Sequence, residues 1–424
     1  MYEMRCDVAI IGGGPAGLSA AVAARKEGAG NVLIIERDES IGGILQQCIH
    51  PGFGLSYFNQ ELTGPEYAGR FAKEALDLGV EVLFNSMVLE VRAQTGEIIC
   101  INTECGMTRV TAKSIILAMG CRERTRANIQ IPGTRPAGIY TAGSAQRLVN
   151  RQNTMVGRNV VILGSGDIGM IMARRMSLEG AKVLAVVEIM DYLAGLTRNK
   201  VQCLDDFNIP LKLSHTITRI AGDQRVEGVY VARVDENRKP VKETEEYIAC
   251  DTLLLSVGLI PENELTRKAD ITISDITSGP EVNQYMQTSV PSVFACGNVV
   301  HVNDLVDNVT VESMLAGQYA ALYAAGKLEQ KQEVRTRTGT NVRYICPQRL
   351  MPCDDGQARL FFRVLAPDMD VRIEARCNGK VIASKKERRV NPGEMCSIKI
   401  PLSEVDSDIV VDVIKEEIGR ASCR

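Results

Sequence analysis

The sequence lacks any Cys-x-x-Cys motif, although it has 13 cysteines among its 424 residues. This number is odd, and the cysteines are scattered along the chain. Such a pattern argues against a disulfide framework and against a four-thiolate zinc site. We therefore expect no metal site, and we expect most of the thiols to be small buried apolar side chains in a reducing compartment.

Long apolar runs and an excess of basic residues are missing as well. No run approaches the roughly 18 residues that a membrane span needs, and the polar residues 1–7 lead into an apolar segment without a cleavage signal. The net charge is −3, from 49 basic and 52 acidic side chains, so a nucleic-acid or membrane surface is not expected. These absences predict a cytoplasmic protein of two or three domains, at about 150 residues each.

The sequence does contain an internal repeat. Residues 6–36 have the pattern of a strand, a glycine-rich turn, an alanine-rich helix and a second strand that ends in Glu36. Residues 159–188 repeat this order and end in Glu188, and the first glycine precedes the acid by the same distance in both copies. Together these parts form the fingerprint of a dinucleotide-binding site, so the chain is expected to have two such sites.

The three glycines of each turn have separate mechanical roles. The first makes the tight turn, the second lets the backbone approach a pyrophosphate, and the third lets helix and strand pack closely. These residues are Gly12, Gly14 and Gly17 in the first copy, and Gly164, Gly166 and Gly169 in the second. The acids Glu36 and Glu188 would accept hydrogen bonds from an adenosine ribose.

The first helical residues after each turn complete the two sites. They are Pro15 and Ala16 in the first copy and Asp167 and Ile168 in the second. A helix N-terminus offers unpaired N–H groups and a positive dipole end to an anion. Asp167 either points away from the ligand or reaches its nicotinamide side, and the sequence leaves both alternatives open.

The residues after each acid favour different ligands. Glu36 is followed by Arg37 and by the glycines at 42–43, whereas Glu188 is followed within three residues by Asp191. A 2′-phosphate at the second site would meet two carboxylates and no nearby arginine. NAD is therefore favoured over NADP at that site.

Three further stretches carry a resemblance to a known superfamily. They are residues 114–120, 252–263 and 288–298, which read SIILAMG, TLLLSVGLIPEN and TSVPSVFACGN. With the two glycine motifs, they resemble the pyridine-nucleotide flavoproteins with two dinucleotide-binding domains, which include thioredoxin reductase and glutathione reductase. The resemblance covers about residues 5–328.

The resemblance implies the cofactors and more of their binding residues. FAD would occupy the first site and NAD the second, and a helix at about residues 309–325 would point its N-terminus at the flavin pyrimidine ring. One departure concerns the flavin ribityl chain, because Asn298 stands where the family has an aspartate, and an amide still makes that hydrogen bond. The further cofactor-binding residues implied are Gly43, Ala118, Gly120, Gly258, Gly297 and Asn298.

The predicted fold class is α/β, with two Rossmann-type three-layer domains and a small C-terminal antiparallel β-sandwich. We expect a discontinuous FAD-binding domain at 1–122 and 258–328, and an NAD-binding domain at 123–257. Residues 329–338 are polar and read as a linker. Short apolar runs with turn signals then predict a β domain at 335–424.

The active site of the disulfide-reducing relatives is incomplete in this sequence. Residues 138–146 contain no cysteine where thioredoxin reductases carry Cys-x-x-Cys, and residues 42–54 contain only Cys48 where glutathione reductases carry a pair. Cys48 is therefore either a single-cysteine redox centre whose pKa is lowered by His50, or a packed cysteine beside a structural imidazole. The structural alternative is the favoured one.

A third candidate catalytic residue is His301, which follows the predicted flavin-closing strand together with Asp304 and Asp307. A histidine beside carboxylates could move a proton during hydride transfer. The alternative, at even weight, is a solvated loop. His215 is expected to be a strand residue of the NAD domain.

A narrower resemblance concerns partners. Residues 46–67 and 299–307 resemble the flavoprotein subunits found with glycerol-3-phosphate dehydrogenases and, more distantly, the α subunit of sarcosine oxidase. It implies a homo- or hetero-oligomer in which the C-terminal domain docks a redox partner. The predicted function is an FAD-dependent NAD(H) oxidoreductase without a dithiol centre, acting on a small molecule or a partner protein. The alternative is a subunit that does not turn over, whose FAD is structural or sensory.

Overall fold

The computed structural model describes residues 1–329 and 331–415. Residue contacts divide the chain into two compact units: Met1–Cys121 together with the chain from Pro261 onward, and the intervening Arg122–Ile260. The short strands β9 (Cys121–Glu123) and β18 (Leu259–Pro261) lie where the chain passes from one unit to the other.

The first unit is built on a seven-stranded sheet with the strand order β5-β2-β1-β8-β7-β6, in which β19 also pairs with β8. β1, β2, β5, β8 and β19 pair in parallel, whereas β7 and β6 extend the sheet as antiparallel strands. Apolar residues fill the parallel centre, where β2 is buried along its whole length. The strands are β1 (Tyr2–Ile11), β2 (Val32–Ile35), β5 (Glu81–Leu83), β6 (Ser86–Arg92), β7 (Glu97–Asn102), β8 (Gly106–Leu117) and β19 (Val293–Ala295).

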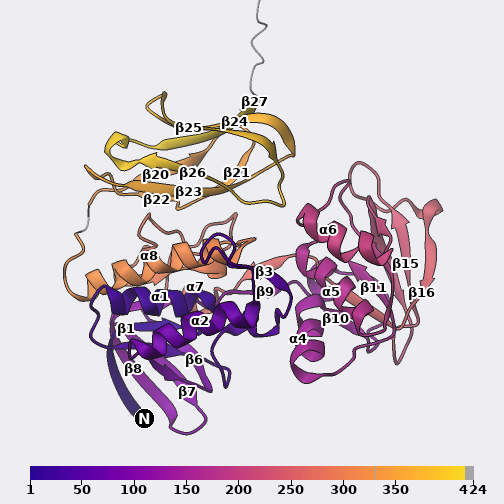
Figure 1. Ribbon diagram of the computed structural model, residues 1–424, viewed down its shortest axis with the longest axis horizontal. Coiled ribbons are helices and arrows are strands. Elements are labelled where there is room, and N and C mark those ends of the chain that lie inside the picture. The colour runs from indigo at the N-terminus through magenta and orange to yellow at the C-terminus, as the bar shows by residue number, and fades with distance from the viewer. Residues whose placement is uncertain (330, 416–424) are drawn as a thin grey trace, which may run out of the picture. The chain divides into compact units, whose positions relative to one another are not determined.

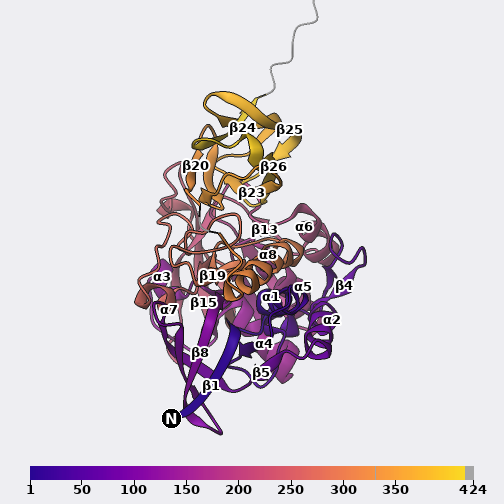
Figure 2. The ribbon, with the colours of Figure 1, turned by 90° about the vertical axis from the view of Figure 1, so that its left-hand side faces the viewer.

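Small residues let two helices of this unit pack very closely. They are α1 (Pro15–Lys26) and α8 (Val306–Ala324), which lie side by side in both ribbon views (Figures 1 and 2). A Cβ on Gly317 of α8 would lie 2.0 Å from the carbonyl oxygen of Ala20 on α1, so only glycine fits there. The helix α2 (Gly64–Asp77) begins with a capping box between Thr63 and Glu66.

The second unit has three layers. Its central sheet has five parallel strands in the order β10-β17-β11-β12-β13, and a separate antiparallel sheet is formed by β14-β15-β16. Alternate residues of β11 enter different cores: Val160 and Ile162 face the helices, while Val161 and Leu163 face the antiparallel sheet. The elements are α3 (Arg126–Ile129), β10 (Ile139–Thr141), α4 (Ala142–Gln152), β11 (Asn159–Leu163), α5 (Asp167–Leu178), β12 (Lys182–Val187), α6 (Thr197–Cys203), β13 (Leu211–Lys212), β14 (His215–Ala221), β15 (Gly228–Arg233), β16 (Glu246–Ala249) and β17 (Thr252–Leu255).

The C-terminal part of the first unit forms a β domain with its own hydrophobic core. Two sheets enclose this core, with the orders β22-β20-β27-β24-β25 and β21-β23-β26, and all their pairs are antiparallel except the parallel pair β20–β27. The strands are β20 (Val334–Thr338), β21 (Val342–Cys346), β22 (Arg349–Leu350), β23 (Gln357–Val364), β24 (Asp368–Cys377), β25 (Lys380–Val390), β26 (Cys396–Pro401) and β27 (Ile409–Lys415). In Figure 1, α8 runs between α1 and these strands.

The predicted fold class is confirmed: the chain combines parallel Rossmann-type sheets with a C-terminal β-sandwich. His215 is the first residue of β14, as predicted. Within residues 1–329 and 331–415, no helix has the length and apolar character that crossing a membrane requires.

Candidate functional site

The first glycine turn connects β1 to α1, and its three glycines differ in what surrounds them. Gly12 has φ +106°, and a Cβ there would lie 2.6 Å from the carbonyl oxygen of Ala118. A Cβ on Gly17 would lie 1.8 Å from the carbonyl oxygen of Gly12. On Gly14, by contrast, the nearest atom to a Cβ would be 3.9 Å away, on Gly43. Packing of the protein itself requires the outer two glycines, while the middle one would accommodate a Cβ in ordinary contact.

Two distant loops meet this turn. Gly42 donates a backbone hydrogen bond of 2.8 Å to Gly13, and this places Gly43 beside Gly14. Gly297 has φ +72°, and a Cβ there would lie 2.9 Å from the Cβ of Ala16. The structure thus brings Gly43, Ala118 and Gly297 to the start of α1, where the sequence predicted a shared site.

The start of α1 fits a pyrophosphate. Gly14 is the N-cap residue, Pro15 follows it, and no side chain in the described residues caps this helix end. The first N–H groups are therefore available to an anion, and the lack of a side chain at Gly14 lets one approach the backbone. Gly120, which has φ +71° and no atom within 4 Å of an added Cβ, leaves further open space beyond β8.

Glu36 is buried and already takes part in the turn. Its Oε2 accepts a hydrogen bond of 2.6 Å from the N–H of Gly13, and its Oε1 accepts one of 2.8 Å from the N–H of Asp38. An ionised carboxylate has about four acceptor positions, so room remains for a ribose hydroxyl. The neighbouring Arg37 is exposed.

The second glycine turn repeats this arrangement between β11 and α5. A Cβ on Gly164 would lie 2.0 Å from the carbonyl oxygen of Ser256, and one on Gly169 would lie 2.6 Å from that of Gly164. A Cβ on Gly166 would meet nothing closer than 3.5 Å. Glu188 is buried like Glu36, and it accepts hydrogen bonds of 2.8 Å from both the N–H and the hydroxyl of Ser165.

The remaining residues of the second site divide between core and surface. Asp167 turns its Oδ1 toward the start of α6, where it accepts hydrogen bonds from the N–H of Leu196 at 2.9 Å and from Asn199 at 2.6 Å. Ile168 packs against the hydrophobic core of this unit, and Asp191 is exposed. Gly258, the last predicted residue of the second site, has φ +100°. An added Cβ there would lie 3.9 Å from the side chain of Arg124.

Cys48 has the surroundings of a structural thiol. It follows the 3-10 helix η1 (Gly43–Gln47), and its Sγ donates to the carbonyl oxygen of Ile44 at 3.3 Å. Burial raises the pKa of Cys48 to about 12, which is the opposite direction from a reactive thiolate. His50 places its Nδ1 3.0 Å from the carbonyl oxygen of Pro51, and its ring packs on Phe53 with 5.0 Å between centroids.

His301 is completely enclosed, so the alternative of a solvated loop is wrong for it. Its exposed fraction is 1%, and its Nε2 lies 2.6 Å from Oε1 of Glu312 on α8. The hydroxyl of Tyr344, from the β domain, lies 3.5 Å from its Nδ1. Burial lowers the pKa of His301, but the carboxylate of Glu312 outweighs burial and holds that pKa well above its ordinary value.

The two aspartates near His301 have separate structural contacts. Asp304 forms a largely buried ion pair with Arg363 of β23 and accepts a hydrogen bond of 2.6 Å from the N–H of Met395. The helix α8 begins at Val306, three residues before the predicted start, so Asp307 lies in its first turn. The Oδ2 of Asp307 accepts a hydrogen bond of 2.8 Å from the N–H of Ser56. Asn298 accepts a hydrogen bond of 2.9 Å from the N–H of Asn303.

Sequence reasoning missed the partners of this cluster. Glu312 lies in the middle of a helix, and Tyr344 and Arg363 lie in strands of the β domain. No spacing signal connects them to His301, because the contacts depend on how the β domain packs against α8.

Comparison with known proteins identifies the family. The model of the pyridine nucleotide-disulphide oxidoreductases matches residues 6–344. The chain belongs to this family. The match ends within β21, near the start of the β domain. Membership accounts for the two glycine turns, and the chain is an FAD-dependent NAD(H) oxidoreductase.

Curated relatives are diverse in their named activities. Hydrogen cyanide synthase subunit HcnB of Pseudomonas protegens is 25% identical, with 79% of this chain and 74% of the relative covered. An NAD(P)H coenzyme A polysulfide/persulfide reductase of Pyrococcus horikoshii is 26% identical, with 77% and 71% covered. Among solved structures, thioredoxin reductase of T. acidophilum has a TM-score of 0.61 at 24% identity, covering 76% of this chain and 99% of its own. That likeness shows the fold.

Proposed function

We propose that this oxidoreductase binds FAD at the turn of Gly12–Gly17 and NAD(H) at the turn of Gly164–Gly169, and that it has no dithiol centre. The observation that supports it most is the middle glycine of each turn. At each helix start, the middle glycine would accommodate an added Cβ at ordinary contact distance, 3.9 Å from the nearest atom at Gly14 and 3.5 Å at Gly166, whereas the outer glycines of both turns are tightly enclosed by backbone. Packing of the protein therefore does not require glycine at this one position of each turn, and the close approach of a pyrophosphate to the backbone explains it.

The residues of the chain act by binding and orientation. When bound, the flavin and the nicotinamide supply the hydride chemistry. The N-termini of α1 and α5 bind the pyrophosphates, and Glu36 and Glu188 use their remaining acceptor positions for the ribose hydroxyls. The dipole of α8 stabilises negative charge near its N-terminus, where a Cβ on Gly297 would lie 2.9 Å from Ala16 of α1 and 3.1 Å from Val309 of α8.

Electrons leave the flavin without a cysteine pair in this proposal. All cysteines in the described residues are free thiols, and Cys48 stands alone in the segment where glutathione reductases carry their pair. A small acceptor or a partner protein then takes the electrons. HcnB is named as a subunit, and the narrower sequence resemblance is to subunits of glycerol-3-phosphate dehydrogenase and sarcosine oxidase. For both reasons, a partner protein that docks on the β domain is the first candidate acceptor.

Turnover without a partner separates this proposal from a structural or sensory flavin. The purified FAD-loaded protein is mixed with NADH and an artificial dye acceptor. We expect turnover of about 1 s⁻¹ or faster. A yellow protein whose NADH oxidation stays at the rate of free FAD would favour the subunit that does not turn over.

A preference for NADH over NADPH is the first testable consequence. In this proposal a 2′-phosphate would meet the carboxylates of Glu188 and Asp191, and charge repulsion would weaken its binding. We expect kcat/KM to be at least about tenfold higher with NADH, near 1.4 kcal/mol. Asp191→Asn should narrow the ratio, whereas Asp223→Asn, elsewhere on the same unit, should not. Equal kcat/KM values for the two nucleotides in the wild type would contradict the assignment.

The second consequence concerns Cys48. Because burial raises its pKa to about 12, the thiol stays protonated between about pH 6 and pH 9, and no thiolate–flavin charge-transfer band should be seen there. NADH should reduce the flavin of Cys48→Ser at a rate within about threefold of the wild type in stopped-flow measurements. A loss of about 100-fold, near 2.7 kcal/mol of barrier, would instead identify Cys48 as the redox centre.

A further inference from the structure

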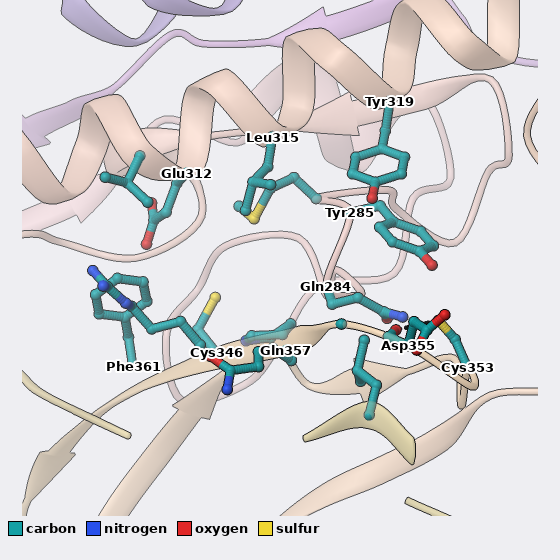
Figure 3. A pocket seen from close by; sticks show the side chains of 17 residues that line it. Gln284, Tyr285, Glu312, Leu315, Tyr319, Cys346, Cys353, Asp355, Gln357 and Phe361 are labelled. Carbon is teal, nitrogen blue, oxygen red and sulfur yellow. Dashed lines mark hydrogen bonds between the residues drawn. The ribbon is translucent and has the colours of Figure 1, made fainter. Parts of the chain in front are cut away.

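A cavity lies between α8 and the β domain, and none of its lining residues belongs to either glycine turn. It has a volume of about 150 Å³. Figure 3 shows Glu312, Leu315 and Tyr319 pointing into it from α8, while Cys346 and Phe361 approach from the β domain. The cavity is thus formed entirely within the first unit.

Strand alternation explains why the β domain presents polar groups to this cavity. On β23, Leu360, Phe362 and Val364 enter the core of the sandwich. The alternate residues Arg359, Phe361 and Arg363 point to the opposite face of β23, toward α8 and the loop that contains His301. Two contacts confirm this direction. The ring centroids of Phe361 and His301 are 6.1 Å apart, and Arg363 forms an ion pair with Asp304.

Most of the cavity wall is apolar or aromatic. Tyr285 and Tyr319 stack on one side with 3.9 Å between ring centroids and 27° between planes. Phe361, Leu315 and Leu402 contribute further apolar surface. A flat or branched apolar group would therefore be well accommodated.

The charged side chains of the wall are not all engaged in ion pairs. Glu312 is neutralised by His301 at 2.6 Å and also accepts from Asn303 at 3.3 Å. Asp355 lies at the exposed rim. Arg359 is half-buried and has no carboxylate within 4.0 Å in the described residues, whereas Arg363 on the same face has Asp304. The Cζ of Arg359 lies 5.9 Å from the ring centroid of Phe361.

We propose that this cavity binds a small monocarboxylate with an apolar body. The guanidinium of Arg359 would accept the carboxylate in its fork, and the stacked tyrosines and Phe361 would contact the apolar part. A cavity of this size holds a molecule such as benzene, so the ligand has about six to nine non-hydrogen atoms. A dianion is disfavoured because Glu312 and Asp355 lie in the same wall. This inference is independent of the cofactor assignments.

Calorimetric titration of the FAD-loaded protein with benzoate and with its neutral isostere benzamide tests this proposal. We expect benzoate to bind with a Kd below about 1 mM, and benzamide to bind at least about tenfold more weakly. Arg359→Gln should weaken benzoate at least about tenfold and leave benzamide unchanged. Arg343→Gln, a matched variant of an exposed arginine on β21, should bind benzoate as the wild type does.

Three outcomes would overturn the proposal. The first is the absence of benzoate binding to the folded wild-type protein, and the second is unchanged benzoate affinity in Arg359→Gln. The third is equal binding of inorganic phosphate, which would exclude a ligand class with an apolar body. If Arg359→Gln fails to fold, Leu315→Phe takes its place, because a larger side chain fills the cavity and should abolish binding of benzoate and benzamide together.

Discussion

Gly14→Val is expected to give a folded but colourless protein. A Cβ at this position meets no atom closer than 3.9 Å, and the backbone of Gly14, at φ −74° and ψ −172°, is open to any residue. The branched side chain would fill the space from which backbone N–H groups reach the pyrophosphate. The affinity for FAD should therefore fall by more than about 100-fold, near 2.7 kcal/mol. The circular dichroism spectrum should stay that of the wild type.

Two comparison variants make this test specific. Gly69→Val, on the exposed side of α2 where an added Cβ meets nothing within 4 Å, should keep its flavin. Gly17→Ala should lose the fold itself, because its Cβ would lie 1.8 Å from the carbonyl oxygen of Gly12. A Gly14→Val protein with the wild-type ratio of flavin to protein absorbance would refute the first site.

The second large effect is expected at the buried pair of His301 and Glu312. The exposed fractions of their side chains are 1% and 3%, so removing one partner leaves the other as an uncompensated buried charge. His301→Leu should destabilise the first unit by about 3–5 kcal/mol in urea unfolding. The double variant His301→Leu/Glu312→Leu should recover much of this loss, because no buried charge remains.

The pH dependence of this pair has a definite sign. The folded-state pKa of His301 lies well above its ordinary value of 6.5. Its contribution to stability is therefore complete below about pH 6.5 and is lost as the pH rises through the folded-state pKa. The stability difference between wild type and His301→Leu should shrink toward alkaline pH. Lys380→Ala, which breaks the exposed ion pair with Glu404, is the control. A stability difference that grows with pH would contradict this role, and so would a His301→Leu variant as stable as Lys380→Ala.

The sequence was most informative where interactions are local. Each glycine turn, its helix start and the acid that follows lie within one short segment. Their spacing therefore predicted the tight turn at Gly12 and Gly164 and the close packing of helix and strand at Gly17 and Gly169. The turns also bind their own acids: Glu36 and Glu188 hold the backbone of Gly13 and Ser165. That the carboxylates bind the turn backbone was not predicted from the sequence, because binding of a ribose hydroxyl already explained their position.

Long-range packing explains what the sequence left open. His301 was singled out as a proton-moving residue beside Asp304 and Asp307, yet its ring contacts come from α8 and the β domain. Asp304 is directed to Arg363, which lies 59 residues away in the chain. The surroundings of Cys48 were equally hidden, since burial, which sets its pKa, depends on residues of several elements.

Anaerobic titration of the FAD-loaded protein with NADH tests the central claim most directly. NADH carries two electrons, and FAD is the one two-electron centre that the proposal contains. The flavin absorbance should therefore bleach completely at about one equivalent of NADH per FAD. A flavin that NADH leaves oxidised, or one that needs about two equivalents because a second redox centre fills as well, would contradict the account.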